Sequence, residues 1–523
     1  MSLDPIALQV VTGALRAACD EMGATLVRSA HSANIKERRD CSTALFDPAG
    51  EMVMQAEHIP VHLGAMPAAV EAVLDQDHAP GRSWLLNDPF AGGTHLPDIT
   101  VVTPVFEHEC RGALLGFAAS RAHHADVGGR VPGSMPADST TLEEEGVVIP
   151  PTAMTAEVTE AVVVRMRQPD QRRADLRAQL AANATGARRL AELAARIGTQ
   201  RLGEATAAVL DYAERRTRAS LAGLAGAPRT ATDVLEAREG DLELRLRATI
   251  DGDGLTLDFT GSAAQHQGNL NCPLAVTRSA CLFAVRVLTD PDIPPSAGAH
   301  RPVRVLAPEG SLLNARPGAA VAAGNVETSS RVADLVLSAF GRAAGQGTMN
   351  NLTLGNEGEP GGPAGGSPAT APGTPFTYYE TLGGGQGACP DADGPSGVHV
   401  AMSNTLNTPV EALELEFPVR VIEYALRRDS GGAGRHRGGD GVVRELEALV
   451  AMHFSLITER RRHAPPGAEG GDPGLPGRNL LDGEPLEPKA SGELRPGQRL
   501  RIETPGGGGH GRAGPQPSGR VVR

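Results

Sequence analysis

The sequence predicts an α+β fold: a large module of mixed helices and strands, with an inserted helical pair and a C-terminal half rich in strands and turns. Segments with helical spacing of apolar residues and segments with strand-like alternation both occur, without a regular strand–helix–strand order. Of the 523 residues, 40% are hydrophobic and 21% charged, which is typical of a globular chain with a sizeable core. Aromatic residues make up only 3%, so the core must be mainly aliphatic.

The N-terminal region, residues 1–170, is expected to open with a helix. Asp4 is a suitable N-cap and Pro5 fits the first helical position, and apolar residues then follow at helical spacing. The further elements expected in this region are a hairpin over 41–53, a helix over 61–76, and strands over 98–108 and 113–124.

Residues 171–228 are rich in alanine, leucine and arginine with periodic apolar positions, which predicts a helical pair. The rest, 229–511, is expected to be an α+β region with many glycine turns. Within it, the Gly/Pro-rich insert 357–375 predicts a flexible surface loop, and residues 512–523 predict a loose tail.

Composition excludes several functional classes. The formal net charge of −13 argues against nucleic-acid binding, which needs a basic face. No run of 18 apolar residues predicts a membrane helix, and the N-terminus lacks the basic and apolar regions of a signal peptide. Six scattered cysteines without a CxxC pair favour a reducing cytoplasm over a disulfide scaffold.

The stretch GGTHLPDIT places His95 and Asp98 three residues apart, in a glycine-rich turn before an apolar strand. Imidazole and carboxylate are common ligands of Zn, Mn and Fe. The stretch SRAHHADVGG adds His123, His124 and Asp126 at the end of the next predicted strand. If the two strands pair, the clusters meet, and a metal site is then as plausible as hydrogen-bonded core or surface histidines.

Other stretches are weaker candidates. The glycine runs at 383–388 and 505–511 lack the lysine of a phosphate loop, and turn glycines are the better interpretation. The run ERRR at 459–462 suits either an anionic substrate or a solvated charged surface. Cys41 lies in a predicted strand and is interpreted as structural. The polar segment 396–411, with His399, Asn404 and Thr405, is interpreted as the wall of a site, with asparagine turns as the alternative.

Many longer motifs occur together and in order from about residue 3 to 511. They include RSAHSANIKERRDCSTALFD, LLNDPFAGGTHLPDITVVTPVF, SRAHHADVGGRVPGSMPADST, AAGNVETSSRVADLV, YYETLGGGQGA, SGVHVAMSNTLNTPVEALELEFP and TPGGGGHG. With these motifs the chain resembles the hydantoinase B / 5-oxoprolinase family, which includes N-methylhydantoinase B-type subunits and is related to acetone and acetophenone carboxylase subunits. The resemblance implies one hydantoinase B-like module over residues 3–511.

The resemblance further implies a metal-dependent hydrolytic subunit of an ATP-dependent ring-opening amidohydrolase. It would act on a small cyclic amide or imide within a hetero-oligomer, with ATP used by a hydantoinase A-type partner of actin-like fold. Carried over from the family motifs, the ligands of a divalent Zn, Mn or Fe ion are His95, Asp98 and one of the two adjacent histidines, His123 being chosen.

The remaining site residues follow from the hydrolytic mechanism that the resemblance implies. Whichever of His123 and His124 is not a ligand, together with Asp126, is a candidate base, and His399 and Glu145 complete the catalytic candidates. Arg130, Asn404 and Thr405 are the candidate substrate-binding residues.

One departure from the family pattern affects these expectations. Ala401 stands where the family commonly has a second histidine after His399. Two alternatives to the hydrolase are open: a subunit of an acetone- or acetophenone-type carboxylase, which the resemblance also implies, and a non-catalytic scaffold for the A-type partner, which Ala401 makes plausible.

Overall fold

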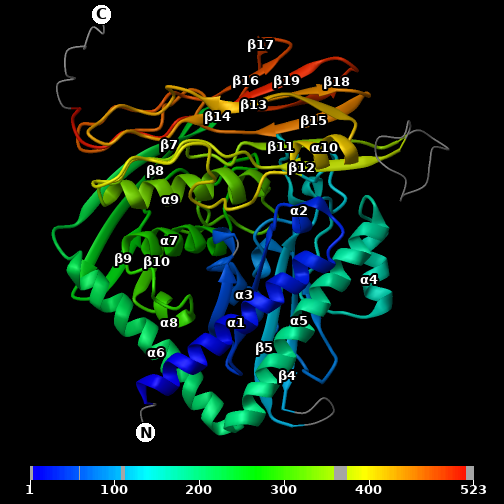
Figure 1. Ribbon diagram of the computed structural model, residues 1–523, viewed down its shortest axis with the longest axis vertical. Helices are drawn as coiled ribbons and strands as arrows, with labels where there is room; N and C mark the ends of the chain where they lie inside the picture. Colours follow the sequence, from blue (N-terminus) through cyan, green and yellow to red (C-terminus); the bar gives the residue numbers. More distant parts are fainter. Residues whose placement is uncertain (1–3, 58, 108–111, 359–373, 514–523) are drawn as a thin grey trace, which may run out of the picture.

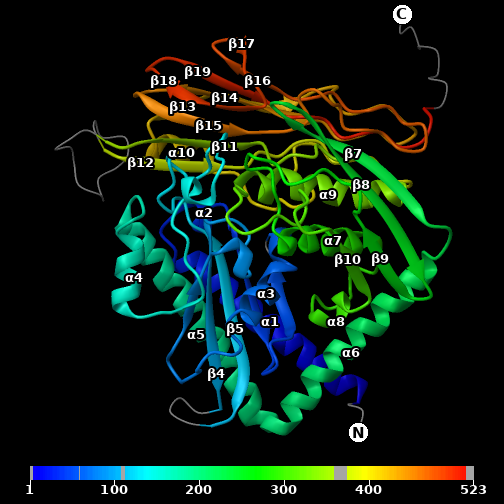
Figure 2. The same cartoon turned by 180° about the vertical axis from the view of Figure 1, so that it is seen from behind.

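The computed structural model describes residues 4–57, 59–107, 112–358 and 374–513, and the fold is α+β, as predicted. The described strands form four separate sheets. The N-terminal sheet with its helices makes the lower part of the molecule in Figure 1, and the two C-terminal sheets are stacked at the top; Figure 2 shows the same arrangement from behind.

The N-terminal sheet holds six strands in the order β2-β1-β5-β4-β3-β6. Neighbouring strands run antiparallel throughout. The strands are β1 (Cys41–Phe46), β2 (Met52–Glu57), β3 (Trp84–Leu86), β4 (Asp98–Phe106), β5 (Leu114–His123) and β6 (Thr152–Ala153). The two predicted strands that carry the candidate ligands are therefore direct neighbours, β4 and β5.

Two long helices, α1 (Pro5–Ser29) and α5 (Pro169–Ile197), pack together against this sheet, and α6 (Thr199–Gly223) completes the predicted helical pair. Asp4 caps α1 by accepting a hydrogen bond from the Ile6 amide, as expected. The shorter helices here are α2 (Ala33–Lys36), η1 (Pro60–His62), α3 (Ala65–Glu71), η2 (Pro89–Ala91), η3 (Leu142–Glu145) and α4 (Ala156–Val163). The helix expected over 61–76 is thus split into η1 and the shorter α3.

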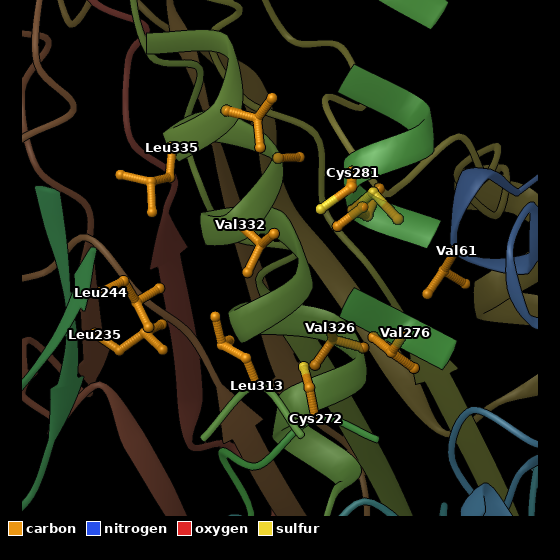
Figure 3. Packing of buried hydrophobic residues seen from close by; sticks show 14 of the residues in the cluster. Val61, Leu235, Leu244, Cys272, Val276, Cys281, Leu313, Val326, Val332 and Leu335 are labelled. Carbon is orange, nitrogen blue, oxygen red and sulfur yellow. The ribbon is translucent and has the colours of Figure 1, made fainter. Parts of the chain in front are cut away.

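The middle of the chain forms the sheet β10-β9-β8-β7 and the helices packed against it. Its elements are β7 (Arg229–Ala237), β8 (Gly240–Asp251), β9 (Gly254–Asp258), α7 (Leu274–Leu288), α8 (Ala297–His300), β10 (Val303–Leu306), the π-helix η4 (Gly324–Thr328) and α9 (Ser329–Ala339). In Figure 3, α9 with Val332 and Leu335 lies between the strands carrying Leu235 and Leu244 and the helix carrying Cys281. Aliphatic and cysteine side chains fill this core, as the low aromatic content requires.

Two C-terminal sheets pack over a shared core, with Leu352 and Phe376 from one sheet and Leu446 and Leu500 from the other. Their orders are β12-β11-β15-β18 and β13-β14-β19-β16-β17. The elements are β11 (Asn351–Asn356), β12 (Phe376–Glu380), α10 (Val410–Glu416), β13 (Val419–Arg427), β14 (Gly441–Ala448), β15 (Met452–Ile457), β16 (Arg478–Leu481), β17 (Glu484–Pro485), β18 (Lys489–Leu494) and β19 (Arg499–Glu503). Most of the insert 357–375 and of the tail 512–523 lies outside the described residues.

Beside these sheets, glycine-rich segments lie backbone against backbone; we call them the glycine bundle, residues 383–388, 431–439, 466–474 and 505–511. The Gly507 carbonyl accepts from the Gly432 amide at 2.8 Å, and the Gly507 amide donates to the Gly439 carbonyl at 2.9 Å. A Cβ on Gly507 would lie 2.1 Å from the Gln386 carbonyl oxygen. Close packing between distant segments, rather than local turns or phosphate binding, therefore explains both glycine runs singled out in the sequence.

The run 459–462 begins inside the protein and reaches the surface at Arg462, which is exposed and pairs with Asp241. Glu459 is fully buried and accepts hydrogen bonds from the Glu236 amide and from Lys489 Nζ, the latter at 2.5 Å. Arg460 donates to Asp233 Oδ2 at 2.6 Å. These ion pairs tie β7 to the C-terminal sheets. Among the described residues, no helix combines the length and apolarity needed to cross a bilayer.

Candidate metal centre

The predicted ligands His95, Asp98 and His123 meet at the end of the N-terminal sheet. Asp98 is the first residue of β4 and His123 the last of β5, and the two are directly paired in the antiparallel register. His95 comes from the preceding turn, where its carbonyl accepts from the Asp98 amide at 3.0 Å. A Cβ on Gly93 would lie 2.3 Å from the Asn87 carbonyl oxygen, so the turn needs glycine at that position.

The three ligand atoms form a nearly equilateral triangle. Asp98 Oδ1 lies 3.1 Å from His95 Nε2 and 3.2 Å from His123 Nδ1, and the two ring nitrogens are 3.1 Å apart. Ligand atoms at about 2.1 Å from one ion lie about 3.0–3.4 Å from each other, so the triangle fits a single transition-metal ion. All three side chains are buried, and they form the one such cluster found among the described residues.

The second carboxylate oxygen of Asp98, Oδ2, contacts two further side chains. Thr94 Oγ1 donates to Asp98 Oδ2 at 2.5 Å, and His62 Nε2 lies 3.4 Å from the same oxygen. The other ring nitrogen of His62 contacts Ser42 Oγ at 2.9 Å. His62 was missed in the sequence because it stands alone in a segment far from both histidine motifs. Partners of this kind fix the orientation of a metal ligand.

These side chains border a small cavity of about 20 Å³, which we call the inner chamber. Such a volume holds one water or ion. Asp40 also borders it, another residue that sequence reasoning missed, and its carbonyl accepts from the His123 amide at 3.0 Å. Tyr379 closes one side, with its ring stacked on His123 at a centroid distance of 4.4 Å.

Electrostatics places two of the predicted ligands, Asp98 and His123, in their metal-binding protonation states. Burial alone would raise the pKa of Asp98, but His95, His123 and His62 outweigh burial and hold this pKa well below its usual value. Burial lowers the pKa of His123, against the opposing effect of Asp98. An ionised carboxylate and a neutral imidazole are therefore present at neutral pH, as metal coordination requires.

The neighbouring candidates His124 and Asp126 lie elsewhere. His124 follows His123 directly, so its side chain takes the other side of the chain, where Nε2 contacts Gln179 Oε1 at 3.0 Å. Burial lowers the pKa of His124 to about 4. Asp126 accepts hydrogen bonds from the Gly128 and Gly133 amides, both at 2.7 Å, and thereby shapes its own loop.

Glu145 and Arg130 also stand apart from the triangle. Glu145 is buried, and its carboxylate accepts hydrogen bonds from the Val321 and Ala322 amides. The shortest distance to each of the two amide nitrogens is 3.0 Å. Burial raises the pKa of Glu145 to about 7. Arg130 is exposed and pairs with Asp138.

Of the candidates in 396–411, Thr405 borders the inner chamber, whereas His399 and Asn404 line a separate, larger cavity. His399 contacts Ser403 Oγ at 2.7 Å through Nδ1 and Asn407 Oδ1 at 3.0 Å through Nε2. The catalytic and substrate-binding roles assigned to these seven residues outside the triangle stay predictions.

Comparison with known proteins agrees with the motifs. The family described as hydantoinase B/oxoprolinase matches residues 4–513. The chain is 39% identical to 5-oxoprolinase 1 of Arabidopsis thaliana, over 97% of this chain but only 42% of that protein. It is 27% identical to the B-type subunit of a putative D-/L-hydantoinase of a Pseudomonas strain, over 97% of this chain and 90% of that protein.

A solved structure shares the fold over almost the whole chain. The ATP-dependent caprolactamase of Pseudomonas jessenii superposes with a TM-score of 0.88 at 28% identity, covering 98% of this chain and 92% of that one. The match to the family over residues 4–513 and this likeness in fold lead to one conclusion: the chain belongs to the hydantoinase B/oxoprolinase family.

Proposed function

We propose that this chain is the metal-dependent hydrolytic subunit of an ATP-dependent enzyme that opens cyclic amides. The observation that carries the proposal is the buried triangle of His95, Asp98 and His123, with ligand atoms 3.1–3.2 Å apart. In support, relatives are named as a 5-oxoprolinase and as the B-type component of a hydantoinase, and a neighbour in fold is described as ATP-dependent.

The three triangle residues would hold a Zn, Mn or Fe ion, and Asp40 offers a further carboxylate at the same chamber. When bound there, such an ion supplies Lewis-acid chemistry that makes hydroxide available near neutral pH. The chain's own contribution is orientation: Thr94 and His62 hold one oxygen of Asp98, so the other is left for the ion. Tyr379 packs over the His123 ring and restricts the approach of water from that side.

Amide chemistry explains why the reaction would be divided between two subunits. Resonance makes the amide carbonyl a poor electrophile, and phosphorylation of its oxygen removes that protection. We assign this ATP-dependent step to an A-type partner, and the delivery of water to the activated carbon to this chain. The inner chamber is buried, so an activated carbonyl that reaches it is shielded from bulk water.

The test is metal content and ATP-dependent ring opening of the chain together with its A-type partner. His95→Ala and Asp98→Ala should each lose bound metal, measured by plasma mass spectrometry, and ring opening should fall by about 10³-fold or more. His31→Ala, at an exposed position outside the triangle, is the matched control and should keep both.

Two results would contradict the proposal. Full metal content and activity in both ligand variants would show that the triangle is an ordinary hydrogen-bonded cluster. Incorporation of labelled bicarbonate into product, without ring opening, would assign the chain to the carboxylases instead.

A further inference from the structure

A second, larger cavity lies beside the inner chamber. This outer cavity has a volume of about 600 Å³, against about 20 Å³ for the chamber. The two share Ser403 as a common wall residue. The segment around Pro60 contributes to both as well, since Pro60 and Leu63 line the outer cavity while His62 lines the chamber.

Apolar side chains border much of the outer cavity, together with polar residues that include Arg286 and Gln386. Phe283 and Val287 come from α7, Leu337 from α9, and Val400 and Ala401 from the segment that separates the cavity from the chamber. Ala401 has the smallest side chain that a chiral residue can offer, so this wall is set back where the family pattern has histidine. A cavity of this size accepts a group much larger than the ring of a simple cyclic amide.

One buried polar side chain borders the cavity without a full set of partners. Asp334 is 5% exposed, and its Oδ2 has no hydrogen-bond partner among the described residues. The nearest cation, Arg460, is 3.9 Å from that oxygen. Burial raises the pKa of Asp334 to about 6, despite the opposing effect of Arg460 and Arg331. Such an oxygen suits an N–H or O–H donor of a ligand.

We infer that the outer cavity is the substrate subsite of this chain, and that it selects a cyclic amide or imide bearing a bulky, uncharged, mainly apolar substituent. The inference rests on the proposed function, because it needs the reacting carbonyl to reach the inner chamber. The substituent packs against Phe283 and Leu337 while the ring faces Ser403. The chamber itself is too small for a ring, so the Ser403 wall, held by His399 at 2.7 Å, has to shift when substrate enters.

This inference distinguishes between substrates within the family's range. The ring of 5-oxoproline carries a carboxylate in place of an apolar substituent, so it would gain little from contact with Phe283 and Leu337. A hydantoin with an aromatic substituent instead gains apolar contact and offers its ring N–H groups as donors. The cavity therefore favours the substituted, uncharged ring.

The test measures binding by isothermal titration calorimetry to the full, zinc-loaded chain with three probes: hydantoin, 5-benzylhydantoin and 5-oxoproline. We expect 5-benzylhydantoin to bind at least tenfold more tightly than hydantoin, which corresponds to about 1.4 kcal/mol, and more tightly than 5-oxoproline. Val287→Trp should abolish this preference, because the larger side chain fills the cavity from its rim. Val164→Trp, at a similarly exposed valine away from the cavity, should keep it.

The inference is overturned if the two hydantoins bind equally, if 5-oxoproline binds best, if no probe binds, or if Val287→Trp leaves the preference unchanged. Metal content separates this failure from that of the proposed function. A wild-type chain that holds its zinc but shows no preference contradicts the cavity inference alone, and Val287→Trp should also retain its zinc. Retention of metal by His95→Ala would count against the triangle, whatever the probes show.

Discussion

Replacing Gly507 by alanine should destabilise the protein strongly, although only one methyl group is added. The new Cβ would lie 2.1 Å from the Gln386 carbonyl oxygen and 2.7 Å from the Gly387 amide nitrogen. Both are backbone atoms, so relief requires two chain segments to separate. A shift of Gly507 away from Gln386 also disturbs its hydrogen bonds to a third segment, since its amide donates to Gly439 at 2.9 Å and its carbonyl accepts from Gly432 at 2.8 Å.

The expected loss combines two contributions. Overpacking a dense interior costs about 1–3 kcal/mol. Weakening two buried backbone hydrogen bonds adds about 1 kcal/mol each. Gly507→Ala should therefore lower the free energy of unfolding by about 3–5 kcal/mol, measured by urea denaturation followed by circular dichroism.

The same substitution at Gly203 is the matched control. Gly203 lies exposed within α6, and a Cβ there would meet nothing within 4 Å. Alanine should stabilise that helix by about 0.5–1 kcal/mol. A Gly507→Ala variant as stable as the wild type, or equal effects at the two sites, would refute the account of the glycine bundle.

Three further predictions concern the site and its surroundings. His62→Ala should weaken zinc affinity by about 10–100-fold in a chelator competition, since His62 orients Asp98 without being a ligand, and unchanged affinity would remove it from the site. Glu145, with a pKa raised to about 7 by burial, binds its proton more tightly when folded, so its contribution to stability is present below pH 4.5 and is lost as the pH rises through 7. Relative to Glu145→Gln, the wild type should thus lose about 3 kcal/mol between pH 4.5 and 7 in urea titrations, and parallel pH profiles would contradict this. Ala401 has a φ of 50°, so Ala401→Gly should raise the free energy of unfolding by about 0.5–1 kcal/mol, and a destabilised variant would show that the methyl group packs usefully.

The triangle of His95, Asp98 and His123 was predictable because its residues lie in two motifs. Each motif is at one end of a predicted strand, and the two strands follow each other in the chain. Antiparallel pairing of β4 and β5 then brings Asp98 opposite His123. The sequence left the choice between His123 and His124 open, and the register of the two strands decides it, because His123 is the residue directly paired with Asp98.

The residues around the triangle were not predictable in the same way. His62 and Asp40 approach it from separate segments, and nothing in their local sequence marks them. The buried ion pairs of Glu459 and Arg460 were missed for a similar reason, since Asp233 lies more than two hundred residues earlier in the chain. Periodicity identifies the elements of a fold, but not which distant polar groups satisfy each other.

If the triangle binds an ion as proposed, the direct pairing of Asp98 with His123 makes the alignment of two strands a condition for that binding. Sliding β4 by a single position along β5 would turn the carboxylate to the opposite face of the sheet, away from the imidazole of His123. A chain that has assembled this sheet incorrectly would then fail to capture its metal. Zinc uptake during refolding would accordingly report correct assembly of the N-terminal half before any catalysis is possible.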